Sequence, residues 1–556
     1  MNTLRRICVI PLIAAGLLLL LVTACVKNAQ LSGEPYPPHP QPLINFYGKP
    51  GTVIQGSEGD TITLQVTGIK QLATGYRFLL NGVSATIVSA TDSLLSVKIP
   101  PSASSGAGSI ATADGQFYYG PTITIVGKVS IDPDFNNASS TVGANGYVST
   151  VFKNSDNNYL LMGGFTNYNN QSVPVGRIVQ ISPGGSFMTT KAGLGASGGI
   201  ASLVPVTILG QTRYIIGGNF GGYYSARFLV SNITQINTNL SIDSVTVAVQ
   251  NPDPENTPQN NTDTVANFNA RLFNGNVVRI FPDADPNKII AVGNFDLYYR
   301  VDYANSVKGN YYPYYRGIRN FARMNLSETE TGRLDTTYNY SHDLLTGKFD
   351  PNLNGDIYDA VQLADKTIVV AGSFTMFNTP SNAAAPVTAA PGIMALTGTG
   401  SINTAFASAI GSGANGYITK ITYNAATKKI LLTGNFTQFN NRPAKGVVML
   451  NEDGTVDPTF NLKSYEGGLI NYAGQLSNGK IILSGYFNKY DGVVRQGFAI
   501  VNADGSLASG YNNSGAFAGA IYGIYEVAAD KLMIFGSISL FDNTRVGNIV
   551  QLKIAP

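Results

Sequence analysis

Short apolar segments that alternate with polar positions dominate the chain, and this pattern indicates strands. Within residues 42–126, strands are expected at 61–66, 76–80, 85–88, 94–99 and 121–126, separated by clusters of Gly, Asp and Ser. The spacing is close to ten residues and no helical period interrupts it. Residues 42–126 are therefore predicted to form a small β-sandwich domain.

Residues 127–556 repeat one pattern of apolar strands. Each unit is expected to hold four strands: one strand, a second that ends in Gly-x-Phe, a third, then a tight Asp-Gly turn and a fourth. The Gly-x-Phe pairs begin at Gly163, Gly218, Gly293, Gly372, Gly434 and Gly485, and Gly536-Ser537-Ile538 is a degenerate seventh copy. The glycine allows close backbone approach or a bend, and the phenylalanine fills the space between stacked sheets. This periodicity predicts a seven-bladed β-propeller.

The two ends of the repeat region complement each other. The last unit stops at the C-terminal sequence NIVQLKIAP and lacks a fourth strand, whereas VSIDPDFNN at 129–137 stands before the first unit and matches TVDPTFNL at 455–462. We therefore expect residues 129–135 to complete the last blade near Ile554. Such closure would remove a free sheet edge.

Both regions resemble known families. Pro42, Gly59-Asp60, the Asn81-Gly82 turn and VKIPPSASSGAG at 97–108 resemble an IPT/TIG immunoglobulin-like domain, although Thr67-Gly68-Ile69 shortens that family's pattern. The later units resemble the delta-60 repeat, a propeller repeat of bacterial secreted and surface proteins. Together with the lipobox-like sequence Val22-Thr23-Ala24-Cys25 near the N-terminus, these two regions resemble surface lipoproteins of Bacteroidetes, which often neighbour SusC/SusD-type nutrient importers. This resemblance implies a location and assigns no reaction.

The N-terminus has the pattern of a lipoprotein signal. Arg5 and Arg6 precede an apolar run from Ile7 to Val22, and Thr23-Ala24-Cys25 follows. Residues 1–24 are predicted to be a signal peptide, and Val22-Thr23-Ala24-Cys25 resembles the bacterial lipobox, which implies lipidation at Cys25. The alternatives are an uncleaved anchor or a soluble secreted protein. The proline-rich residues 26–41, which follow Cys25, are predicted to form an extended tether.

The amino-acid composition excludes several classes of function and site. There are 36 basic and 33 acidic residues, so no charge excess favours nucleic-acid binding. Two His and two Cys exclude a His-rich metal centre and a disulfide framework, and no metal or cofactor is expected. His39 lies in the tether and His342 has no partner histidine, so neither is expected to be a ligand. Gly193-x-Gly195-x-x-Gly198 and Gly411-x-Gly413-x-x-Gly416 are interpreted as loops between blades, since neither has a helix after it.

No catalytic motif is recognised. The recurring acids Asp132, Asp134, Asp335 and Asp457 could act as an acid and base pair, but their repetition favours a turn or strand-end hydrogen bond. The most unusual segment is 298–316, which interrupts the third unit. Tyr side chains combine a flat apolar face with a polar tip, which suits a sugar or protein ligand. The alternative is that the insertion packs on the propeller. The candidate ligand- or partner-binding residues are Tyr298, Tyr299, Tyr303, Tyr311, Tyr312, Tyr314 and Tyr315.

These observations predict a lipid-anchored outer-membrane protein exposed at the cell surface. We expect it to capture a nutrient polymer, glycan or peptide, or to support a SusC/SusD-type importer, with the membrane as a partner through its lipid. Two alternatives stay open: a propeller glycoside hydrolase or lyase that uses unrecognised carboxylates, and a purely structural protein-interaction scaffold. The insertions at 244–272 and 378–392 are interpreted as surface loops.

Overall fold

The computed structural model describes residues 44–47, 53–72, 75–135, 143–172, 175–188, 192–224, 229–252, 255, 261–327, 331–338, 352–378 and 387–555. The signal peptide, Cys25, the tether and His342 lie outside these residues. Nearly all regular elements of the described part are β-strands, in agreement with the all-β class predicted from the sequence. Its helices are the short α2 (Thr404–Ile410) and the single-turn η1 (Ile69–Leu72).

The first domain holds eight strands in one hydrogen-bonded path, β1-β3-β6-β5-β4-β7-β8-β2. Their bounds are β1 (Asn45–Tyr47), β2 (Ile54–Gly56), β3 (Thr61–Thr67), β4 (Arg77–Leu80), β5 (Val83–Ala90), β6 (Leu94–Lys98), β7 (Gly106–Ala111) and β8 (Phe117–Ile125). Five of them were predicted, and β3 buries every second residue as its alternation requires. Phe78, Leu80, Leu95 and Val97 are fully buried in the common core of these strands.

Three-stranded antiparallel meanders follow along the rest of the chain, and we number them first to seventh in sequence order. The first three are β10 (Val148–Lys153), β11 (Tyr159–Gly163) and β12 (Ile178–Ile181); β14 (Gly199–Ile208), β15 (Gln211–Asn219) and β16 (Ile233–Asn237); β20 (Val277–Pro282), β21 (Lys288–Gly293) and β24 (Phe321–Asn325). The fourth and fifth are β26 (Ile357–Gln362), β27 (Ile368–Gly372) and β30 (Ile393–Leu396); β31 (Tyr417–Asn424), β32 (Lys429–Asn435) and β35 (Val447–Asn451). The last two are β36 (Tyr465–Gln475), β37 (Ile481–Tyr490) and β39 (Phe498–Val501); β40 (Ala518–Ala528), β41 (Lys531–Phe541) and β43 (Ile549–Ile554).

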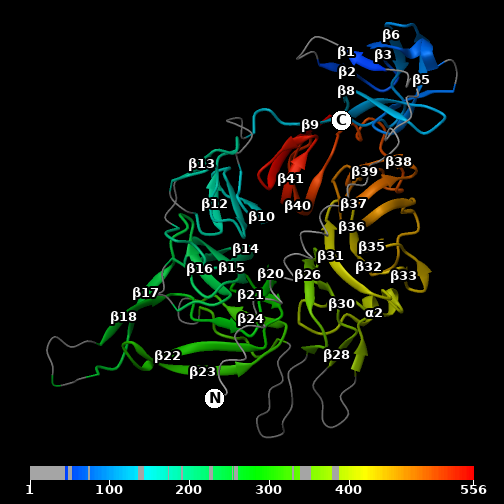
Figure 1. Cartoon of the computed structure of the whole chain (residues 1–556). Coiled ribbons are helices and arrows are strands. Elements are labelled where there is room, and N and C mark those ends of the chain that lie inside the picture. The colour runs from blue at the N-terminus through cyan, green and yellow to red at the C-terminus, as the bar shows by residue number, and fades with distance from the viewer. Residues whose placement is uncertain are drawn as a thin grey trace, which may run out of the picture.

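The meanders form a ring with their first strands innermost (Figure 1). Each first strand contacts the first strand of the next meander, and β40 of the seventh contacts β10 of the first. The ring also closes through β9 (Val129–Ile131), which pairs with β43 in the register Leu552↔Ile131 and Ile554↔Val129. The predicted pairing of the displaced N-terminal strand with the last unit is therefore confirmed.

The recurring Gly-x-Phe pattern has the two roles expected for it. In every meander the glycine lies opposite the first strand, as in the pairs Val148↔Gly163 and Ile418↔Gly434. A Cβ at Gly163 would lie 2.0 Å from the Tyr147 carbonyl oxygen, so only glycine fits. The partner Phe165 is 1% exposed and packs in the core between neighbouring meanders, as Ile538 does in the seventh copy.

The expected fourth strand is shorter than predicted. Only β9 and β13 (Phe187–Met188) form strands at this fourth position among the described residues. Elsewhere the position holds single β-bridges, such as Met324↔Leu334 and Leu450↔Val456. In the third and fifth meanders an aspartate turn follows the bridge immediately, at Asp335 and Asp457. In the fourth meander, α2 takes this place, with Asn403 as its N-cap accepting a hydrogen bond from the Phe406 backbone NH.

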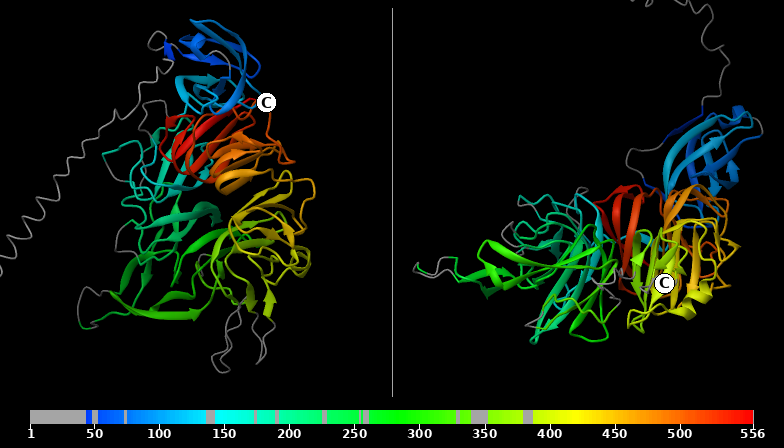
Figure 2. Two further views of the ribbon diagram at one scale, coloured as in Figure 1. Left: turned by 45° about the vertical axis from the view of Figure 1, so that its right-hand side comes forward. Right: turned by 90° about the horizontal axis from the view of Figure 1, so that it is seen from below.

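Further strands lie outside the meanders, and some of them form hairpins that extend from the ring (Figures 1 and 2). Their bounds are β17 (Ser244–Ala248) and β18 (Thr262–Ala266); β19 (Arg271–Phe273), β22 (Leu297–Val307) and β23 (Asn310–Gly317); β25 (Asn352–Leu353), β28 (Met376–Asn378) and β29 (Val387–Ala389); β33 (Gln438–Phe439), β34 (Arg442–Pro443), β38 (Val493–Val494) and β42 (Thr544–Arg545). The sequence predicts a surface loop for the insertion at 244–272, but β17 and β18 pair over five residues.

The first domain is fixed to the ring beside its sixth and seventh meanders (Figure 2). Asn513 makes the central contacts: its backbone oxygen accepts a hydrogen bond from the Ser105 backbone NH at 2.8 Å, and its side-chain NH2 donates to the Ile125 oxygen at 3.3 Å. Arg495 is 2% exposed and donates to the Ser102 carbonyl. Burial lowers the pKa of Arg495 to about 10. This buried polar contact gives the two parts a defined orientation.

Candidate binding site

The tyrosine-rich segment forms one antiparallel hairpin, β22–β23, in register from Leu297↔Gly317 to Asp302↔Tyr312. Alternate residues of a strand point to opposite faces, so the seven tyrosines divide into two groups. Tyr299 and Tyr315 oppose each other on one face, while Arg300 and Tyr314 oppose each other on the other face.

The first face is packed. Tyr299 contacts Tyr315 with ring centroids 5.1 Å apart, and the Arg271 guanidinium lies 4.5 Å from the Tyr299 ring centroid. Tyr303 contacts Tyr311 at 5.8 Å, and the Tyr311 hydroxyl donates a 2.6 Å hydrogen bond to Asp263. Burial, followed by this hydrogen bond and the Asp263 charge, raises the pKa of Tyr311 to about 12. Tyr299, Tyr303 and Tyr311 are therefore packed, which is the alternative that the sequence leaves open, while Tyr315 contacts Tyr299 but is itself 52% exposed.

The second face borders a cavity of about 720 Å³, a volume suited to a small ligand or one or two units of a polymer. The β17–β18 hairpin supplies apolar walls, and the segment 331–336 supplies the remaining side. The insertion at 244–272, to which the sequence assigned no role, thus builds part of this cavity. Its polar and aromatic lining includes Asn267, Asn269, Tyr298, Arg300, Asp302, Tyr314, Arg333 and Thr336, and Tyr303 of the first face also borders it.

The cavity offers aromatic faces and hydrogen-bond donors. Tyr314 is 38% exposed and the Arg316 guanidinium stacks 4.2 Å from its ring centroid. The Arg300 guanidinium makes no hydrogen bond or ion pair with any residue that the structure describes, and it lines the cavity. Asp302 is the single carboxylate among the described residues of the lining, and its oxygens accept hydrogen bonds from Asn305, which fixes the end of the hairpin.

Tyr298 belongs to the core rather than to the accessible surface. It is fully buried, its hydroxyl donates to the Gly332 oxygen at 2.8 Å, and the Leu334 NH donates to the same hydroxyl. Because both hydrogen-bonding capacities are used by the backbone, Tyr298 anchors the hairpin and forms the floor of the cavity. Of the seven candidate tyrosines, Tyr312, Tyr314 and Tyr315 are the exposed ones.

A second group of exposed tyrosines was missed by sequence reasoning. Tyr147 and Tyr522 make an edge contact at 5.8 Å, and Tyr358 and Tyr417 make another at 6.3 Å. Each of the four is next in sequence to the first-strand residue that pairs with the recurring glycine. Gly-Ala-Asn-Gly-Tyr occurs at both 143–147 and 413–417. That repeat signalled two equivalent tyrosines, but it was interpreted only as a loop between blades.

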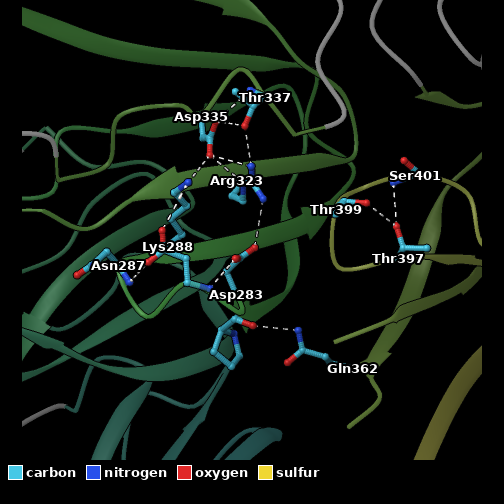
Figure 3. Close-up of polar contacts among 12 residues, drawn as sticks. Asp283, Asn287, Lys288, Arg323, Asp335, Thr337, Gln362, Thr397, Thr399 and Ser401 are labelled. Atoms are coloured by element: carbon cyan, nitrogen blue, oxygen red, sulfur yellow. Dashed lines mark hydrogen bonds and ion pairs between the residues drawn. The ribbon is translucent and has the colours of Figure 1, made fainter. Parts of the chain in front are cut away.

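The recurring aspartates are structural. Asp335 is 8% exposed; one carboxylate oxygen accepts from the Thr337 NH at 2.9 Å, and the other pairs with Lys288 and Arg323 at 2.9 Å each (Figure 3). Asp457 repeats this arrangement with Thr459 and Lys429, and Asp132 does so with Asp134 and Lys531.

The acids are not arranged as a catalytic pair. Asp132, Asp335 and Asp457 belong to different meanders, and each is neutralised by a cation of the sheet that it joins. Asp134 is 72% exposed and pairs with Lys553. Burial acts to raise the pKa of Asp335, but hydrogen bonds from Thr337 and Lys288 outweigh it and hold the pKa below the usual range. These geometries agree with the turn interpretation of the sequence.

No group of three or more His, Cys, Asp and Glu side chains among the described residues is arranged to hold a metal ion. Among the same residues, the helices are too short to span a bilayer. His342 and Cys25 lie outside them, so the interpretations of these two residues stay predictions.

Comparison with known proteins gives one family match. A family model described as "Domain of unknown function (DUF5122) beta-propeller" matches residues 426–460 and 476–508. These segments include β32, β35, β37 and β39 of the fifth and sixth meanders. No curated protein matches the chain significantly.

Solved structures give distant similarity. A protein of unknown function from Bacteroides thetaiotaomicron is 10% identical with a TM-score of 0.27, covering 93% of this chain and 99% of that one. A gluconolactonase from Xanthomonas campestris is 11% identical with a TM-score of 0.25, covering 77% and 99%. A quinonprotein alcohol dehydrogenase-like protein from Bacteroides thetaiotaomicron is 10% identical with a TM-score of 0.26, covering 92% and 99%.

The family match falls on two consecutive repeat units of the ring. These units have the same strand order and the same glycine contacts as the other meanders. The ring of antiparallel meanders is therefore a β-propeller.

Proposed function

We propose that this chain is a lipid-anchored binding protein of the outer membrane that captures a polymeric nutrient at the cell surface. In this proposal the meanders are the blades of a seven-bladed propeller, and residues 42–126 are an IPT/TIG-like domain that serves as its pedestal. The lipid on Cys25 and the proline-rich tether hold both parts at the bilayer. A SusC/SusD-type importer is the proposed partner at that surface.

The observation that supports binding is the cavity beside β22–β23. Tyr314 offers a ring face for stacking, while the Arg300 guanidinium supplies hydrogen-bond donors. Such a combination suits the hydroxyl-rich faces of a sugar or the polar backbone of a peptide. The described lining contains one carboxylate, Asp302, whereas glycoside hydrolysis ordinarily uses two. Binding is therefore favoured over hydrolysis.

Ligand capture is tested with the double variant Arg300→Ala/Tyr314→Ala. We expect the wild-type protein to be retarded in native gels that contain starch, polygalacturonate or mucin. The double variant should lose at least about ten-fold in affinity, because two central contacts of ~1 kcal/mol or more each are removed. Dissociation constants from retardation against polymer concentration provide the measurement.

The matched control is Tyr119→Ala. Tyr119 is 76% exposed on the first domain, remote in sequence from the cavity, so this change removes an exposed tyrosine without altering the lining. Its retardation should equal that of the wild type. Polymer binding at this cavity is contradicted if none of the three polymers retards the wild-type protein. It is also contradicted if the wild type and the double variant have equal affinities.

Membrane anchoring is tested separately at Cys25. Cys25→Ser removes the thiol that the lipid would occupy, so the protein should move from the membrane fraction to the soluble periplasmic or culture fraction. Metabolic labelling with a fatty acid and fractionation followed by immunoblotting measure the two effects. The control variant Cys8→Ser, which keeps Cys25, should remain labelled. Membrane retention of unlabelled Cys25→Ser protein would contradict the lipid anchor.

A further inference from the structure

Every first strand of the ring contains a β-bulge at the same position, directly after the residue that pairs with the recurring glycine. A bulge redirects the side chains that follow it. The residues after the bulges, from the first to the seventh meander, are Thr150, Ser202, Arg279, Asp359, Lys420, Tyr472 and Gly523. Repetition around the ring therefore places charged residues on three consecutive meanders and small residues on three others.

The three charged residues form a compact group. Arg279 and Lys420 each lie 2.7 Å from a different oxygen of Asp359. Asp359 is 2% exposed, while the Arg279 and Lys420 side chains are 23% and 17% exposed. Two cations thus share one carboxylate, which leaves one positive charge in a largely desolvated place. Burial lowers the pKa of Lys420 even though Asp359 opposes that effect.

The excess charge faces a cavity of about 350 Å³ at the inner strands. Its lining includes Arg279 and Lys420, but neither Asp359 nor any other carboxylate among the described residues. The small residues Thr150, Ser202 and Gly523 also line it and leave the space that larger side chains would fill. An occupant of this cavity therefore meets two cationic side chains and no anionic one.

We propose that this inner cavity binds a small anion through a carboxylate or phosphate group held between Arg279 and Lys420. Such an anion offsets the positive charge that Asp359 leaves uncompensated, and charge-assisted hydrogen bonds from both cations hold it. The competing explanation is structural: the three charged residues only join the third, fourth and fifth meanders. The two explanations predict opposite results for anion binding.

Isothermal titration of the purified full chain with inorganic phosphate and, in a second arm, with malonate tests the proposal. Ionic strength is held constant, and the two arms distinguish phosphate from carboxylate recognition. We expect saturable binding of at least one anion to the wild-type protein. Lys420→Met should weaken it by at least about ten-fold, because one charge-assisted hydrogen bond is lost.

Lys429→Met is the matched control, since Lys429 pairs with Asp457 and does not line the cavity. It removes the same charge and should leave anion affinity unchanged. Asp359→Asn should tighten binding, because both cations then face the anion without competition. Lys420→Met leaves the Arg279–Asp359 pair intact, so it keeps the test decisive if Asp359→Asn does not fold.

Two results would overturn the proposal. One is the absence of binding for both phosphate and malonate by the wild-type protein. The other is equal anion affinity in Lys420→Met and Lys429→Met. Arg300→Ala, at the separate cavity beside β22–β23, should leave anion binding unchanged. Anion binding at the inner cavity and polymer binding beside β22–β23 can therefore be confirmed or contradicted independently.

Discussion

Replacing Asp132 with alanine should lower the free energy of unfolding by about 3 kcal/mol, the cost of breaking a buried ion pair. Asp132 is fully buried next to β9 and pairs with Lys531 at 2.9 Å and Lys553 at 3.2 Å. It also accepts a 2.8 Å hydrogen bond from Gln551, which is itself buried. The variant leaves Gln551 without this partner at the junction that closes the ring. Urea denaturation followed by far-ultraviolet circular dichroism measures the loss.

Asp134→Ala is the matched control for this variant. Asp134 lies two residues away and is 72% exposed, with one ion pair to Lys553 at 3.4 Å. It removes the same charge from the same segment, but an exposed pair contributes at most about 1 kcal/mol. Equal losses for the two variants would show that charge in general, rather than the buried contacts of Asp132, stabilises the closure.

The effect of Asp132 should depend on pH in a defined direction. Burial acts to raise the pKa of Asp132, but hydrogen bonds from Lys531 and Gln551 outweigh it and hold the pKa below the usual range. A carboxylate with a depressed folded-state pKa stabilises fully above its unfolded pKa, about 3.9, and loses that contribution as pH falls through the folded-state value. The difference in free energy of unfolding between the wild type and Asp132→Ala should therefore be constant at neutral pH and shrink below about pH 4.

Gly434→Ala should destabilise the propeller by about 3 kcal/mol, at the upper end of the cost of overpacking. A Cβ at this position would lie 2.3 Å from the Tyr417 oxygen and 2.8 Å from the Ile418 Cα. Both are backbone atoms, so the alanine is accommodated only if the first strand moves away from the second. That movement would weaken the β31–β32 pairing. The midpoint of thermal unfolding, followed by circular dichroism, measures the effect.

Gly221→Ala provides the comparison. A Cβ there has no neighbour within 4 Å, and the site lies beside another Gly-x-Phe pair. Its unfolding midpoint should stay close to that of the wild type. A Gly434→Ala protein with an unchanged midpoint would mean that the recurring glycine is not required by the close strand approach.

Much of the fold could be predicted from local sequence patterns. Strict alternation in β3 predicted a half-buried strand, and the 51-residue spacing of Gly434, Gly485 and Gly536 predicted repeated sheets. The displaced strand at 129–131 could be assigned to the last unit because the repeat was short of one strand there. Because these signals are local or periodic, they can be recognised in the sequence without the three-dimensional structure.

The candidate site was predictable only in part. The density of tyrosines in 298–316 identified the hairpin, but not which face of it would be packed. That division depends on the register of β22 with β23 and on Arg271, Asp263 and the β17–β18 hairpin, which are distant in sequence. Tyr298 was consequently grouped with accessible tyrosines although the core buries it.

The all-β class, the repeat and the strand that closes the ring could be predicted from the amino-acid sequence, because each rests on alternation or spacing along the chain. The two cavities could not, because they form where strands of different repeat units meet. Arg279, Asp359 and Lys420 are far apart in the sequence and belong to different repeat units, so no motif unites them. They meet because the ring brings the same bulged position of successive first strands to one axis, where charge and space are set by neighbours rather than by local sequence.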